Sequence, residues 1–125
     1  MKKITKQDIF NTAANGLLKQ GKKSGDGFSC FYRGPNGLKC AIGMLIPDEL
    51  YKARFEGQSA GESGVINVLI KIGVPNTIEY ANFLENLQGV HDDYHTDKWD
   101  RELVNFAHHY GLNPLPMYEG VKELP

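Results

Sequence analysis

Apolar residues recur every three or four positions over much of this chain, which is the period of an α-helix with one buried face. The first such stretch covers about residues 6–20, with Thr5 as a suitable N-cap and Gly21 as a terminator. A shorter stretch covers 65–72 and stops at Gly73, although its β-branched residues leave a buried strand open. The pattern predicts an amphipathic N-terminal helix and a second, shorter helix.

Two further helical stripes follow in the C-terminal part of the chain. One consists of Tyr80, Leu84, Leu87, His91 and Tyr94, and the other of Trp99, Leu103, Phe106 and Tyr110. Thr77 precedes the first stripe as an N-cap, and Thr96 or Asp97 precedes the second. The turn at 95–97 is short enough to join the helices as an antiparallel pair. Residues 112–125 contain several prolines, which predict an extended tail.

The stretch between Phe28 and Gly43 has a different pattern and reads FSCFYRGPNGLKCAIG. Apolar and polar residues alternate on both sides of the Gly-Pro-Asn-Gly turn at 34–37, and this is a strong signal for a β-hairpin. We therefore expect an α+β fold: a mainly helical single domain, residues 1–125, with a small antiparallel β-hairpin sheet.

Length and composition narrow the class of protein. The chain of 125 residues suits one globular domain, and no apolar run approaches the roughly 20 residues that cross a membrane. Polar residues follow the basic N-terminus directly, unlike in a secretory signal. We expect a protein without a membrane partner in the cytoplasm, where both cysteines are thiols.

The net charge of −1 hides an uneven distribution of charge. Residues 1–54 contain ten Lys or Arg against four Asp or Glu, whereas residues 55–125 contain four against eleven. A basic half can bind an anion, but no run of Lys or Arg exceeds two residues, which favours attraction between the two halves. The candidates for a ligand-binding surface, which would take a small anionic ligand, are Lys22, Lys23, Arg33 and Glu56.

Nucleic-acid and cofactor binding have little support in the sequence. Arg33 beside alternating aromatic residues could stack on bases, but a single arginine in a hairpin is a weak signal for nucleic acid. No phosphate-binding loop motif and no dinucleotide motif occurs. We therefore expect no cofactor.

Cys40 and His91 are the residues most able to form a catalytic pair. Cys40 stands where a strand would feed a helix, which can lower the pKa of a thiol, and His91 could serve as the base of a Cys-His hydrolase. Against this enzyme, Cys40 also suits a small core residue, and a carboxylate one residue from His91, such as Asp92, cannot readily orient its ring. A disulfide between Cys30 and Cys40 fits one hairpin register but not a reducing compartment. The balance is against an enzyme.

A metal-binding module is the other chemical alternative. His91 and His95 are four residues apart on one predicted helix, and His109 lies near the edge of the next apolar stripe, so the three imidazoles could share a metal. The acids of the segment HDDYHTD scatter around the helix axis, and the glutamate of an HExxH motif is missing. We therefore assign no metal ligand.

The order of motifs resembles that of a group of short uncharacterised proteins from phages and prophages. The matching pieces are Tyr32-Arg33-Gly34, 37–43, Pro47 to Tyr51, Glu56-Gly57, Leu87-Gln88, His91-Asp92 and Trp99. The resemblance implies an accessory protein of a mobile element and carries no catalytic residue or cofactor. The expected function is therefore a small cytosolic binding or regulatory protein, whose partner is a host protein, a defence component or a small anionic ligand.

Overall fold

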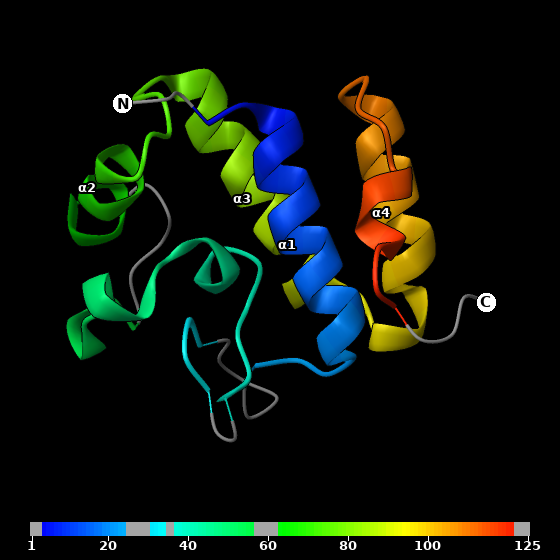
Figure 1. The fold of residues 1–125 in the computed structure, drawn as a ribbon, viewed down its shortest axis with the longest axis horizontal. Helices are drawn as coiled ribbons and strands as arrows, with labels where there is room; N and C mark the ends of the chain where they lie inside the picture. The colour runs from blue at the N-terminus through cyan, green and yellow to red at the C-terminus, as the bar shows by residue number, and fades with distance from the viewer. Residues whose placement is uncertain (1–3, 25–30, 35–36, 57–62, 122–125) are drawn as a thin grey trace.

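The computed structural model describes residues 4–24, 31–34, 37–56 and 63–121, and within them the chain is built from helices (Figure 1). The four α-helices of these ranges are α1 (Lys6–Gln20), α2 (Ser63–Lys71), α3 (Ile78–Asp93) and α4 (Trp99–His109). Five short 3-10 helices accompany them: η2 (Gly43–Leu45), η3 (Asp48–Leu50), η4 (Ala53–Phe55), η5 (Thr96–Lys98) and η6 (Leu115–Tyr118). The prediction of a mainly helical chain is confirmed for these ranges. None of their helices has the length and apolar character that a membrane span requires.

Local sequence signals explain where α1 begins and ends. The Thr5 hydroxyl accepts from Asp8 N, and the Asp8 carboxylate accepts from Thr5 N, both at 3.1 Å, which is a capping box. Gly21 has a φ of +67°, and its N–H donates to the carbonyl oxygen of Leu17. Glycine adopts this left-handed conformation without steric cost, so it ends the helix. The predicted bounds of the helix are confirmed.

Helix α1 lies between α3 and α4 in the view of Figure 1, and buried aromatic rings join the three helices. The Phe10 ring of α1 stacks on Phe106 of α4 with 6.1 Å between centroids, and Phe83 of α3 lies 5.2 Å from Phe106. Helices α3 and α4 run in roughly opposite directions, as predicted, and η5 connects them. Most residues of their predicted stripes are buried: Leu84, Leu87, His91, Trp99, Leu103 and Phe106.

The predicted β-hairpin sheet is wrong, because the described residues of the hairpin segment, 31–34 and 37–43, form no strand. The remaining residues of that segment lie outside the described ranges. Gly34 N donates to the carbonyl oxygen of Leu38 at 2.7 Å and links the two sides of the turn, but η2 then begins instead of a second strand. We call residues 31–34 and 37–43 the corner. The described part of the fold is therefore helical and not α+β.

Side chains from outside the corner satisfy backbone groups that a sheet would pair. The amide of Gln20, at the end of α1, bonds both the N–H and the carbonyl oxygen of Lys39 at 2.8 Å each. Gln88 of α3 accepts from Ile42 N at 3.0 Å. Buried backbone groups need partners but do not need a neighbouring strand to supply them. Side chains already supply these hydrogen-bond partners here, so the two sides of the turn do not need to pair as β-strands.

The C-terminal segment packs on α1. Met117 of η6 is fully buried, and the Asn15 amide of α1 donates to the carbonyl oxygens of Met117 and Glu119 at 2.9 and 2.6 Å. Residues 112–121, for which the sequence predicts an extended tail, thus contain a 3-10 helix that completes the core. Residues 122–125 lie outside the described ranges.

Candidate functional site

The carboxylate of Glu56 fastens the chain after η4 to the corner. Its Oε1 accepts from Tyr32 N at 3.0 Å, and its Oε2 accepts from Arg33 N at 3.1 Å. The Tyr51 hydroxyl donates to the same Oε2 at 2.6 Å, and burial together with this carboxylate raises the pKa of Tyr51 to about 12. Glu56 therefore acts as a backbone anchor.

The guanidinium of Arg33 also bonds to groups of the protein itself. It donates to the carbonyl oxygens of Gly43 and Ile46 at 2.8 and 2.6 Å, and to Asp48 Oδ1 at 3.0 Å. It lies over the Tyr51 ring, 5.0 Å from the centroid, which is a favourable place for a cation. These contacts hold the corner against η2 and η3.

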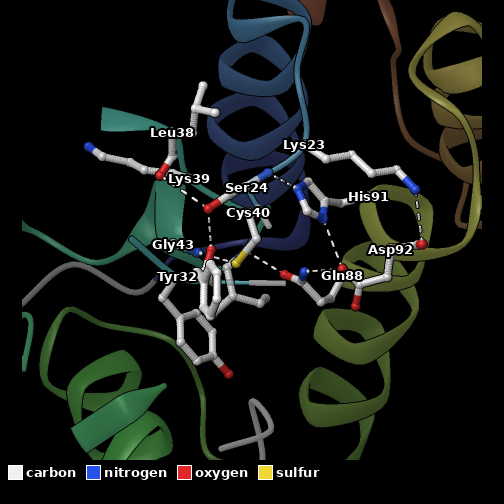
Figure 2. A network of polar contacts seen from close by, with 12 residues as sticks. Lys23, Ser24, Tyr32, Leu38, Lys39, Cys40, Gly43, Gln88, His91 and Asp92 are labelled. Atoms are coloured by element: carbon white, nitrogen blue, oxygen red, sulfur yellow. Dashed lines mark hydrogen bonds and ion pairs between the residues drawn. The ribbon is translucent and has the colours of Figure 1, made fainter. Parts of the chain in front are cut away.

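The four residues of the predicted ligand-binding surface separate into two places. Arg33 and Glu56 meet in the corner through Arg33 N. Lys23 instead donates from Nζ to the carbonyl oxygen of Asp92 at 3.1 Å, near the C-terminal end of α3 (Figure 2). A cation suits this end because the last carbonyl groups of a helix lack intrahelical partners. Lys22 is exposed.

His91 of α3 is fully buried and has a partner at each ring nitrogen (Figure 2). Nε2 accepts from Ser24 N at 3.1 Å, and Nδ1 lies 2.8 Å from Asp92 Oδ1. Because a backbone N–H can only donate, Nε2 carries a lone pair and the ring proton lies on Nδ1. The ring stacks on Trp99 with 5.3 Å between centroids. His91 thus links the chain after α1 to α3 and α4.

The contact between His91 and Asp92 contradicts the expectation that an adjacent carboxylate cannot orient the ring. Both residues lie in the last turn of α3, where Gln88 Nε2 donates to Asp92 Oδ1 at 2.8 Å. Gln88 thereby holds the carboxylate within reach of the imidazole. The pair is oriented as in a catalytic triad, but the N–H of Ser24 occupies the nitrogen that would face a nucleophile.

Cys40 is a buried free thiol whose surroundings disfavour the thiolate. Burial raises the pKa of Cys40 to about 12, and a hydrogen bond from Gly43 N, 3.4 Å from Sγ, offsets this only in part. His91 already uses both ring nitrogens, so it has none left to take the thiol proton. This geometry does not favour a Cys-His hydrolase. Cys30, the other half of the considered disulfide, lies outside the described residues.

We expect the Cys40 thiol to resist alkylation in the folded protein. A Cys30→Ser variant has Cys40 as its sole cysteine, so labelling reports on one group. Iodoacetamide at pH 8 should label the native variant at least about a hundredfold more slowly than the urea-unfolded variant, because the thiolate is scarce and the sulfur is covered. Mass spectrometry over time measures both rates. Rapid native labelling with a midpoint near pH 8.5 would contradict this expectation and revive the reactive-thiol hypothesis.

The three histidines of the considered metal site lie in different surroundings. His91 is buried, whereas the exposed His95 has its Nδ1 2.9 Å from Asp97 Oδ1. The exposed His109 packs edge-on against Tyr110. Among the residues that the structure describes, no three His, Cys, Asp or Glu side chains are placed to hold a metal ion. The three imidazoles therefore do not share a site.

A groove of about 420 Å³ lies between α3 and α4. One face of each helix lines it: Glu85, Asn86, Gly89, Val90 and Asp93 on α3, Tyr94 after α3, and Glu102, Asn105, Phe106, His109 and Tyr110 on or just after α4. The Asn86 amide donates to the Tyr110 hydroxyl at 2.8 Å and ties the two walls together. The volume falls in the range of ligand-binding clefts.

Gly89 widens this groove from the α3 side. A glycine inside a helix costs about 1 kcal/mol relative to alanine, so its presence needs a reason. A Cβ at this position would meet Asp93 Oδ2 at 3.4 Å and nothing nearer in the described part of the chain. Packing therefore does not demand the glycine, and the effect of the missing side chain is free space in the groove.

The chemistry of the groove suits a cation. Its lining includes three carboxylates and three aromatic rings, on Glu85, Asp93, Glu102, Tyr94, Phe106 and Tyr110. No Lys or Arg occurs among its described lining residues, although Arg101 lies 3.4 Å from the Glu102 carboxylate. The protein already holds one cation against one of these rings, because Lys6 Nζ lies 5.8 Å from the Tyr110 centroid and pairs with Glu79.

Sequence reasoning missed this groove. Its charged and amide residues lie outside the two predicted apolar stripes, where polar side chains are ordinary, and Tyr94, Phe106 and Tyr110 were assigned to the core stripes. The available signal was Gly89, which falls opposite the apolar stripe in the middle of a long predicted helix and has no capping role.

Comparison with known proteins identifies no relative, since no protein-family model, no curated protein and no solved structure matches the chain.

Proposed function

We propose that this chain is a small binding protein that takes a lysine- or arginine-bearing segment of a partner protein into the α3–α4 groove. The observation that carries the proposal is a groove lined by carboxylates and aromatic rings, without a lysine or arginine among its described lining residues. An entering guanidinium or ammonium group gains ion pairs and contacts with ring faces at once. The placement of Lys6 beside Tyr110 is an internal example of the same recognition.

The resemblance to phage and prophage accessory proteins supports a role for this binding protein inside a host cell. In that setting the protein acts in the host cytoplasm and occupies a basic segment of a host protein or a defence component. The proposal assigns no reaction to the chain, because recognition through the groove needs no catalytic group.

Filling the groove tests the proposal. A Gly89→Leu variant should bind a fluorescein-labelled peptide with two arginines at least about tenfold more weakly than the wild type, since the leucine occupies the space that the peptide needs. Its thermal midpoint should not fall, because leucine favours a helix over glycine by about 0.8 kcal/mol. Fluorescence anisotropy at constant ionic strength gives the affinity, and thermal unfolding gives the midpoint.

A matched variant separates the groove from the rest of α3. Asn82→Leu adds the same side chain at an exposed position of α3 outside the groove, and it should leave the affinity unchanged. The peptide with glutamine in place of arginine should not bind. Equal affinity of the wild type and Gly89→Leu would refute the assignment to the groove, and equal affinity of the two peptides would refute recognition of a cation.

A further inference from the structure

A second pocket, of about 280 Å³, lies between α2 and the 3-10 helices η3 and η4, and it shares no lining residue with the α3–α4 groove. Helix α2 lies beside η4 (Figure 1). Residues on the two walls include Asn67, Val68 and Lys71 of α2 and, opposite them, Leu50, Lys52 and Arg54. Asn67 and Val68 precede Lys71 by four and three positions along the helix, so both lie on the same side of α2 as Lys71.

Cations line both walls of this pocket. Lys71 belongs to the α2 wall, and Lys52 and Arg54 belong to the wall of η3 and η4. None of the three forms an ion pair with a residue in the described ranges, whereas Arg33 of the corner is paired with Asp48. Like charges around one pocket repel each other, and an anion that lies between them offsets this repulsion because each cation attracts it. The pocket therefore suits an anionic ligand.

Glu49 narrows the class of that ligand. Glu49 also lines the pocket, and its carboxylate repels a ligand that carries negative charge at every end. The same carboxylate accepts hydrogen bonds from hydroxyl groups. The amide of Asn67 can both donate to and accept from such groups. We propose that this pocket binds a small hydroxylated phosphate monoester, such as a sugar phosphate or a nucleoside monophosphate. The three cations hold the phosphate, and Glu49 and Asn67 hold the hydroxyl groups.

Calorimetric titration at constant ionic strength tests this site with ribose 5-phosphate, adenosine monophosphate, inorganic phosphate and ribose. Both esters should bind, and ribose should not. Lys71→Gln should weaken both esters at least about tenfold, because one charge-assisted contact is lost. Glu49→Gln should lower the preference for ribose 5-phosphate over inorganic phosphate. Lys98→Gln removes the same charge at an exposed position outside the pocket and should leave all affinities unchanged.

The outcomes distinguish the two classes of ester from each other, and they distinguish binding in the pocket from nonspecific attraction between charges. Tighter binding of adenosine monophosphate identifies a nucleotide site, and tighter binding of ribose 5-phosphate identifies a sugar phosphate site. The proposal is overturned if neither ester binds, or if Lys71→Gln and Lys98→Gln weaken binding equally. A single-stranded oligonucleotide that displaces both esters at lower concentration would assign the surface to nucleic acid and also overturn it. Because the groove is not involved, none of these results depends on the peptide experiment.

Discussion

A Gly43→Ala substitution is expected to destabilise the protein by about 3 kcal/mol or more, although it adds a single methyl group. A Cβ on Gly43 would overlap the carbonyl oxygen of Tyr32 and lie 3.1 Å from its carbonyl carbon. The obstacle is backbone, and Glu56 holds that backbone by accepting from Tyr32 N at 3.0 Å. Either the corner moves away from η2 or this hydrogen bond is lost. Urea unfolding followed by circular dichroism measures the change in the free energy of unfolding.

The same methyl group at another glycine is the control. Gly89→Ala adds it within α3, where the nearest atom is Asp93 Oδ2 at 3.4 Å. We expect this variant to be more stable than the wild type by about 0.5–1 kcal/mol, since alanine is the better helix former. Equal stability of Gly43→Ala and the wild type would show that the corner does not pack closely on η2.

Removal of the buried imidazole should have an effect of similar size. His91→Ala is expected to destabilise the protein by about 4 kcal/mol, because it leaves a cavity beside Trp99 and takes the acceptor from Ser24 N. Thermal and urea unfolding should both report the loss. His91→Phe restores a ring but no acceptor, so it should recover part of the stability and not all of it.

An exposed histidine four residues away provides the comparison. His95→Ala removes a side chain that is 80% exposed, and the expected change in stability is within about 0.5 kcal/mol. If His91→Ala were no less stable than His95→Ala, the buried link between the chain after α1 and the two C-terminal helices would have no energetic role.

Helices α1 and α3 were predictable from the sequence because their signals are local, whereas the predicted cap of α4 at Thr96 or Asp97 is wrong, since these residues belong to η5. Thr5 and Thr77 cap α1 and α3 through hydrogen bonds to residues three positions on, and Gly21 ends α1. The apolar repeat then identified the buried face of each helix. It failed at the end of one stripe, where Tyr94 is exposed because α3 has already ended at Asp93.

The corner was not predictable in the same way because its partners are remote. Its turn residues and its alternation are those of a hairpin, and both are visible in the sequence. The hydrogen bonds that decide its conformation come from Gln20, Glu56 and Gln88, at separations of 19, 24 and 46 residues. No spacing or composition marks these three side chains as partners of a backbone so far away.

For the candidate sites, the sequence likewise indicated which side chains can bind a ligand but not what they contact in the fold. Sequence reasoning recognised Arg33 and Glu56 as groups able to bind a ligand, and it placed them on one surface. In the structure they do lie together, but their hydrogen bonds go to the protein itself. The groove and the cationic pocket each combine residues from segments that are separate in the sequence. The sequence does not show which of these segments lie side by side, so neither site could be predicted from it.

The span of the hydrogen bonds around the corner also constrains the order of events in folding. The bond from Ser24 N to His91 joins residues 67 apart, and the bond from Ile42 N to Gln88 joins residues 46 apart. Closing chain segments of this length costs conformational entropy before any contact repays it. Helices α1 and α3 contain their own caps and can form early. The corner can acquire its native shape only after both have docked, so the segment with the most hairpin-like sequence closes late.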